Sequence, residues 1–260
     1  MANQKLISFD LKAEFGFFKK PDINDGLFVT YNMLHKPILL GILGAILGMK
    51  GYEKNGEMPE YYAKLKHLKI GIQPLLSDKG NFTKEMVSYN NGTGLATNAN
   101  GGNLIITEQI LINPSYRCFL LLDLDKSDEK TLYKYIMSYK AEFLPYLGKN
   151  DFSAWWENAE DTYSITKFDF SSDFKIVSIF KKTEAISGCI VKSMSICDIQ
   201  EEANFVYFEK LPTGFNETLF QYEYGDFVYA NTLFKKEINM HPDGIFYKIT
   251  KDKTEIIQLF

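Results

Sequence analysis

Apolar and polar positions follow two periods along this chain, one of two residues and one near 3.6. Residues 5–11 (KLISFDL) alternate and predict a strand. Residues 35–50 place their apolar side chains on one face, with Pro37 in the first turn, and predict a helix. Further segments predict a helix at 59–68, a strand at 69–76, a central apolar strand at 116–124, a helix capped by Ser127 at 127–141, and a strand at 152–158.

Residues 77–103 break this pattern, because they hold five glycines and six asparagines with few apolar anchors. A structureless loop of this length is uncommon inside a compact domain. The segment therefore predicts a projecting β-hairpin, with 82–89 as the outgoing strand and 104–107 as the returning one. Residues 107–111 are predicted to form a short turn.

The predicted elements follow the order strand, helix, strand, insertion, strand, helix, strand. This is the βαββαβ order of an α+β, ferredoxin-like (RRM-type) domain, here spanning residues 1–160 with a thumb inserted at about 77–104. Residues 161–260 predict short strands separated by turns. We interpret them as a strand-rich extension packed on the first domain; a separate second domain is the other interpretation.

The predicted helix at 35–50 carries three glycines, Gly41, Gly44 and Gly48. Each costs about 1 kcal/mol relative to alanine in a helix interior. Glycines at this spacing favour the close approach of another backbone, from a sheet or from a nucleic acid.

Composition limits the class of protein. An apolar fraction of 45% suffices for a core, and three widely spaced cysteines without a CxxC pair favour a reducing compartment. No signal peptide is recognisable, and the most apolar run, 37–49, is too short to cross a bilayer. The sequence therefore predicts a soluble, cytoplasmic protein without a membrane contact.

Charge is distributed unevenly. The net charge of −4 argues against a free-standing RNA binder of the RRM type, but residues 1–70 hold 10 lysines against 7 acids. A polyanionic partner should therefore prefer the N-terminal part. Arg117 is the only arginine among 29 basic residues, which disfavours sequence-specific readout of a duplex and favours lysine contacts with phosphate.

Four segments, spread over most of the chain, carry a family likeness. They are 9–48, with its glycine-bearing helix, 108–117 (EQILINPSYR), 146–152 (YLGKNDF) and 208–215 (FEKLPTGF). In this order they resemble the CRISPR-associated protein 5 family of the RAMP superfamily, and the last segment is similar to its type I-B branch.

The resemblance implies a ferredoxin-like body with a β-hairpin thumb. It further implies a subunit that caps the Cascade complex, binds the 5′ handle of the CRISPR RNA and contacts the backbone and large subunits. It leaves open whether the chain also touches target DNA near the flanking motif. One branch of the family cuts repeat RNA with a Tyr, Lys and His set. Here His35, His67 and His241 stand far apart, so a non-catalytic subunit is the prediction and a metal-independent endoribonuclease is the alternative.

Two N-terminal groups are candidate RNA contacts. Lys19 and Lys20 lie beside phenylalanines and could hold phosphate while a base stacks, or belong to a solvated loop. A second group leads into the glycine-bearing helix, whose N-terminus could seat a phosphate or could simply be capped. It consists of Tyr31, Asn32, His35 and Lys36.

Two later cations have equally open roles. Arg117 could fork onto a phosphate or form a buried ion pair, and Lys149 has the same alternatives. The thumb could contact a nucleotide or a neighbouring subunit, or nothing at all. Its candidate residues are Phe82, Lys84, Asn90, Asn91, Asn100 and Asn103.

Metal and cofactor sites are not expected. The chain holds no HxH, HExxH or CxxC motif, and the acidic pair Asp123 and Asp125 ends a predicted strand.

Overall fold

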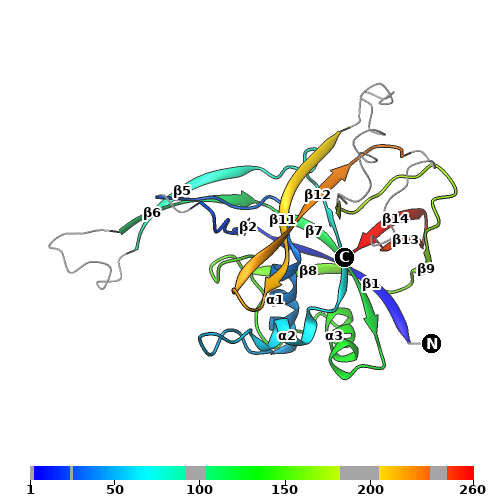
Figure 1. Cartoon of the computed structure of the whole chain (residues 1–260), viewed down its shortest axis with the longest axis horizontal. Helices are drawn as coiled ribbons and strands as arrows, with labels where there is room; N and C mark the ends of the chain where they lie inside the picture. The colour runs from blue at the N-terminus through cyan, green and yellow to red at the C-terminus, as the bar shows by residue number, and fades with distance from the viewer. Residues whose placement is uncertain (1–2, 24–25, 92–103, 182–204, 235–244) are drawn as a thin grey trace.

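The computed structural model describes residues 3–23, 26–91, 104–181, 205–234 and 245–260. They form a body, a long hairpin that projects from one side, and a two-stranded ribbon across the front of the body (Figure 1). Among the described residues, no helix is long and apolar enough to span a bilayer.

A four-stranded antiparallel sheet is the centre of the body. Its strand order is β4 (Lys69–Pro74), β7 (Ser115–Asp123), β1 (Gln4–Ala13) and β8 (Ala154–Glu160). Helix α1 (Lys36–Leu47) and the short α2 (Glu60–Leu65) connect β1 to β4, and α3 (Ser127–Met137) connects β7 to β8. Each of these elements overlaps one that the sequence pattern predicts.

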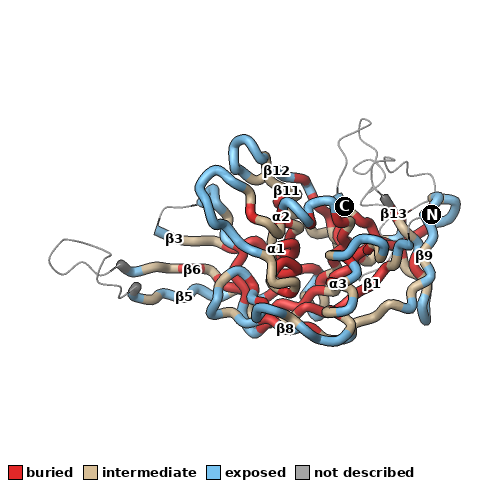
Figure 2. The backbone as a smooth tube through the Cα atoms, turned by 90° about the horizontal axis from the view of Figure 1, so that it is seen from below, coloured by how far each residue is buried: buried red, intermediate tan, exposed pale blue. Residues whose placement is uncertain are grey.

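Both faces of the sheet are covered, which explains why β1 and β7 are apolar on both sides. Phe9 and Leu120 belong to the main core with Leu43 of α1 and Ile136 of α3. The buried positions accordingly concentrate in the centre of the body (Figure 2).

The opposite face is covered by three C-terminal strands, β9 (Ser164–Lys167), β13 (Ile245–Thr250) and β14 (Thr254–Leu259). Leu6 and Phe119 of the sheet pack there against Ile257 and Leu259. An RRM stacks bases on an open sheet face. In this chain that face is occupied by protein, so bases would have to bind elsewhere.

The predicted hairpin consists of β5 (Lys84–Asn91) and β6 (Leu104–Ile112). The prediction of a turn at 107–111 is wrong, because β6 continues to Ile112 and pairs with β2 (Phe15–Gly16) and β3 (Leu27–Phe28) at its base. Ile110 and Leu111 are buried there and anchor the hairpin to the body.

The front ribbon is formed by β11 (Val206–Asn216) and β12 (Gln221–Ala230), with β10 (Phe180–Lys181) at its edge. Leu211 and Phe227 belong to the main core. A second cluster of rings, including Phe174 and Phe234, packs behind the ribbon. The division into a domain and an extension stays a prediction, although these contacts tie the ribbon to the body.

The glycines of α1 have a different neighbour from the predicted one. A Cβ at Gly44 would lie 2.4 Å from the Cβ of Tyr61, so Gly44 lets α2 approach α1. Gly48 ends the helix with φ 74°, where glycine is favoured. The predicted Ser127 cap is also wrong, because Lys126 is the N-cap of α3 and no side chain caps it.

Candidate nucleic-acid interface

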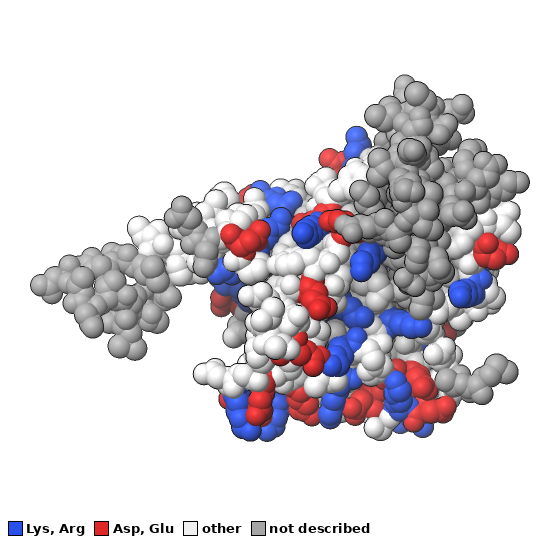
Figure 3. Space-filling model, in the orientation of Figure 1, with Lys and Arg blue, Asp and Glu red and all other residues white. Residues whose placement is uncertain are grey.

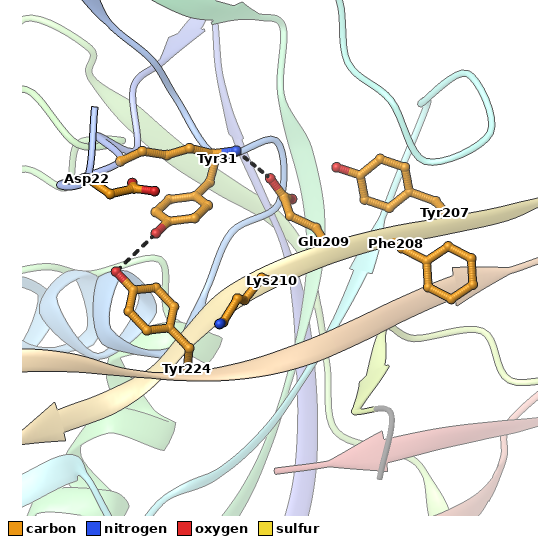
Figure 4. A pocket seen from close by; sticks show the side chains of 8 residues that line it. Asp22, Tyr31, Tyr207, Phe208, Glu209, Lys210 and Tyr224 are labelled. Atoms are coloured by element: carbon orange, nitrogen blue, oxygen red, sulfur yellow. Dashed lines mark hydrogen bonds and ion pairs between the residues drawn. The ribbon is translucent and has the colours of Figure 1, made fainter. Parts of the chain in front are cut away.

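A hollow of about 440 Å³ lies between the N-terminal loop and the front ribbon (Figure 4). Its lining residues come from the loop before α1, from β11 and from the end of β12. They are Lys20, Asp22, Tyr31, Tyr207, Phe208, Glu209, Lys210 and Tyr224.

Backbone pairing sets the position of the loop. The N–H of Lys20 donates to the Val29 carbonyl at 2.8 Å, and the N–H of Tyr31 donates to the Phe18 carbonyl at 2.8 Å. The Thr30 hydroxyl accepts from the N–H of Phe18. Lys20 is therefore held at a fixed place in the lining, and Lys19 precedes it in the same loop.

Glu209 fastens this loop to β11. Its carboxylate oxygens accept the backbone N–H groups of Asn32 and Met33, both at 3.0 Å. Burial raises the pKa of Glu209, while these two hydrogen bonds and the Lys20 ammonium, 3.7 Å away, act in the opposite direction. Glu209 thus stabilises the loop and offsets the charge of Lys20.

Two lysines of the hollow, Lys20 and Lys210, and the neighbouring Lys19 lie over aromatic rings. The Nζ atoms of Lys19, Lys20 and Lys210 lie 3.8, 5.1 and 5.7 Å from the ring centroids of Phe28, Tyr31 and Tyr224. Among the described residues, Lys19 and Lys210 form no ion pair, so their ammonium groups are free to bind an anion.

Two rings at the hollow face solvent. Phe208 is 58% exposed and Tyr224 is 39% exposed. The hydroxyls of Tyr31 and Tyr224 approach to 3.5 Å and close one wall (Figure 4). Burial raises the pKa of Tyr31, which keeps its phenol protonated at neutral pH. Free ammonium groups beside exposed rings suit phosphates joined to unpaired bases.

Charge does not form a broad basic field. On the face shown in Figure 3, lysines and acids alternate over the described part of the surface. Attraction of a polyanion to this face therefore depends on local groups and not on a broad basic surface.

Asn32, a predicted RNA contact, is instead a structural residue. Its side chain is buried; Nδ2 donates to the Gly80 carbonyl at 2.6 Å and Oδ1 accepts from the N–H of Phe82 and the ammonium of Lys84. The amide thereby connects the loop to the base of the hairpin. No atom of it is left for RNA.

His35 does not form the predicted phosphate seat. It occupies the N-cap position of α1, but its side chain makes no cap, is 1% exposed and packs edge-on against Tyr31 and Tyr222. Neither ring nitrogen has a partner among the described residues, and burial lowers the pKa of His35 to about 3. Lys36 donates to the Phe260 carbonyl at 3.0 Å, and burial lowers its pKa to about 8.

The two later cations are paired with acids. Arg117 donates two hydrogen bonds to Asp10, at 2.7 and 3.0 Å. Of the two roles that the sequence left open for Arg117, the structure therefore shows the ion pair. The ammonium of Lys149 lies 2.6 Å from Glu108 and 3.0 Å from the Tyr89 hydroxyl at the base of the hairpin.

The predicted thumb residues divide between the base and the projecting part. Phe82 is buried against Tyr116, with ring centroids 5.0 Å apart, so it is a core residue and not a tip contact. Lys84 begins β5 and its pKa is lowered by burial. Asn90 is exposed on β5, and Asn91 pairs with Leu104. Asn100 and Asn103 lie outside the described residues.

The histidines are not assembled with one another. His67 contacts Glu129 at 2.7 Å, but the same carboxylate also pairs with Lys126 and accepts the N–H of Asp123, beside the start of α3. His241 lies outside the described residues. In the described part of the chain, no group of three or more His, Cys, Asp or Glu could hold a metal ion.

Sequence reasoning missed the half of the site that β11 and β12 supply. Its residues are Tyr207, Phe208, Glu209, Lys210 and Tyr224. A signal was present, because the segment 208–215 carried part of the family likeness. No site residue was predicted there, since the pattern alone does not show which strand faces the loop.

Comparison with known proteins bears on the fold. A chain from the cryo-EM structure of the type III-B Cmr-beta complex bound to cognate target RNA and AMPPnP matches with a TM-score of 0.52 and 11% identity, over 92% of this chain and 90% of that one. This chain therefore shares its overall fold with that Cmr-beta chain.

Other matches are weaker. A chain of a CRISPR RNA-guided surveillance complex gives a TM-score of 0.47 at 11% identity, over 90% of this chain and 94% of that one. A CRISPR protein from Archaeoglobus fulgidus gives 0.42 at 11% identity, over 97% of both chains. No family model and no curated protein matches the sequence.

Proposed function

We propose that the chain is a non-catalytic, RNA-holding subunit of a CRISPR effector complex of the Cascade kind, close to type I-B. In this role it binds the 5′ handle of the CRISPR RNA, caps the complex, and contacts the backbone and large subunits, with target DNA as a further candidate. The sheet order β4-β7-β1-β8 with α1 and α3 supports a ferredoxin-like RAMP domain. The Cmr-beta likeness and the projecting hairpin also support the proposal.

The observation that carries the proposal is the hollow with its lysines over rings. Lys210 presents an ammonium group without an ion pair among the described residues, and Phe208 and Tyr224 present exposed rings at the same hollow. Lys19, in the adjoining loop, is a second ammonium group without an ion pair there and lies over Phe28. Phosphates and stacked bases of a single strand need this combination. The only arginine is engaged by Asp10, so bidentate reading of base edges is not part of the proposal.

We also propose that the chain does not cut the RNA that it holds. A general base must reach its proton within hydrogen-bond distance. His35 is buried, and the carboxylate beside His67 is engaged by α3 and Lys126. We therefore assign holding, and not cutting, to this chain.

The direct test is RNA affinity of the full chain, measured by fluorescence anisotropy with a labelled single-stranded RNA across a salt series. We expect Lys19→Ala/Lys20→Ala/Lys210→Ala to bind at least about ten-fold more weakly at low salt. The slope of log affinity against log salt should fall by about two, because each lost phosphate contact on a single strand accounts for roughly 0.7.

A matched variant removes the same charge elsewhere. Lys130→Ala/Lys134→Ala/Lys167→Ala alters three exposed lysines on α3 and β9, which make no ion pair among the described residues. It should keep the wild-type affinity and slope. Because Lys20 also contacts Glu209, Lys19→Ala/Lys210→Ala serves as a milder variant. Equal weakening by both triple variants would show that only net charge matters and would refute the site.

A further inference from the structure

A second, larger hollow lies along the glycine face of α1. Its volume is about 860 Å³, and its walls come from α2, from the segment after α1, from residues 143–146, and from the ends of β11 and β12. The surface is mainly aromatic and aliphatic, with Tyr52 62% exposed and Phe143 58% exposed. It adjoins the first hollow, because Tyr222 lines one, Tyr224 lines the other, and their ring centroids are 6.2 Å apart.

Four phenol hydroxyls around this hollow have no hydrogen-bond partner among the described residues. They belong to Tyr52, Tyr61, Tyr146 and Tyr222. Burial raises the pKa of Tyr61, and it raises that of Tyr222 to about 12, so these two remain donors at neutral pH. A ligand that displaces water from these hydroxyls must offer them hydrogen-bond partners, because a buried hydroxyl without a partner costs about 1–3 kcal/mol.

The α1 side of the hollow has backbone exposed at Gly41, between the side chains of Ile38, Ile42 and Ala45. A Cβ at Gly41 would have its nearest neighbour, the ring of Tyr61, at 3.8 Å, which is ordinary contact with space left over. The helix therefore does not need a glycine there to pack against α2, in contrast to Gly44. The missing side chain leaves room for a flat group against α1.

We propose that this second hollow binds one unpaired nucleobase of an RNA strand whose phosphates are held at Lys19 and Lys210. This inference rests on the proposed function. A base offers two flat faces for the rings and a polar edge for the hydroxyls, which an aliphatic peptide side chain does not. The one lysine in the lining, Lys50, is paired with Glu53 at 3.0 Å, so the walls favour a neutral ring and leave the phosphates outside.

The test uses the full chain and short single-stranded RNAs in which one adenine is replaced by 2-aminopurine, whose fluorescence falls when it stacks. We expect strong quenching at one position of the RNA. Gly41→Leu fills the α1 side of the hollow and keeps a strong helix former, and it should abolish that quenching and weaken binding by about ten-fold, as expected for one lost stacked base. Tyr222→Leu should act in the same direction.

Three controls separate the outcomes. Lys130→Leu adds the same side chain to an exposed position of α3 and should leave the quenching unchanged. Lys19→Ala/Lys210→Ala should weaken binding of the whole strand but leave the quenched position the same at saturating protein. Free adenosine distinguishes a site for separate nucleosides from one that needs the strand, because only the former is blocked by it.

Three results would overturn the proposal. If RNA binds and Gly41→Leu leaves the quenching intact, the second hollow is not a base site, while the proposed function stands. If wild-type protein binds no RNA in low salt, both fail together. If Gly41→Leu leaves RNA binding and quenching unchanged but removes a protein subunit that co-purifies with the chain, the occupant is a protein.

Discussion

Whether a basic residue of this chain can hold RNA depends on the acid beside it. Lys149 and Arg117 are each neutralised by a buried carboxylate, so they stabilise the fold. Lys19 and Lys210 lie over rings and lack an acid partner among the described residues. The sequence alone does not separate the two pairs, because the acids that neutralise Lys149 and Arg117 lie 41 and 107 residues away in the chain.

The two inner glycines of α1 should respond oppositely to alanine. Gly44→Ala should lower the free energy of unfolding by about 1–3 kcal/mol, since its Cβ would meet Tyr61 at 2.4 Å. Gly41→Ala should raise it by up to about 1 kcal/mol, because alanine favours the helix and the space is open. Urea unfolding of both variants measures this. Equal effects of the two substitutions would contradict the assigned packing of α1 on α2.

His35 should make the protein less stable as pH falls. Its pKa in the folded protein is lowered to about 3, whereas the unfolded chain takes up this proton near pH 6.5. The folded state therefore loses stability below about pH 6.5, at up to roughly 1.4 kcal/mol per pH unit. Urea unfolding at pH 7 and pH 5 should show a smaller loss for His35→Phe, which keeps an aromatic ring between Tyr31 and Tyr222, than for wild type. Identical losses would mean that His35 is not sealed from water.

At the scale of elements, the sequence predicts the helices and strands that have a clear apolar period. It does not predict which polar side chains pair with one another. The strands of the central sheet and the helices α1 and α3 follow clear apolar periods, and they are present. The turn predicted at 107–111 is wrong, because β6 runs through these residues and its Glu108 is paired with Lys149, 41 residues later in the chain. Of the predicted residues, Lys20 and Tyr31 line the hollow. Glu209 was not predicted, because its backbone partner Asn32 lies 177 residues away.

The projecting part of the hairpin should be dispensable for folding. Tyr89 and Ile106 are paired, so an Asn-Gly turn can join them in register and remove residues 90–105. The buried anchors Ile110 and Leu111 stay in place. We expect the free energy of unfolding to change by less than about 1 kcal/mol, as measured by urea unfolding, and we expect the shortened chain to be lost from the assembled complex. A loss of several kcal/mol would show that the removed residues pack on the body.

At the scale of the whole molecule, the arrangement leaves no open face of the central sheet for a ligand. The face that an RRM leaves open is covered here by β13 and β14, with Ile249 and Ile257 against Leu6 and Phe119. The hollows instead lie where the front ribbon meets the N-terminal loop and α1. RNA held there would rest against loops, the front ribbon and a helix.

The central claim, that this chain holds RNA without cutting it, is tested most directly by recovering the RNA after binding. End-labelled CRISPR repeat RNA is incubated with excess full-length protein in EDTA, and the bound fraction is eluted and sized. We expect uncut RNA in the bound fraction, and much less bound RNA with Lys19→Ala/Lys210→Ala. A single cut at the handle boundary that disappears in His67→Ala or Tyr31→Phe would contradict this account and establish the endoribonuclease.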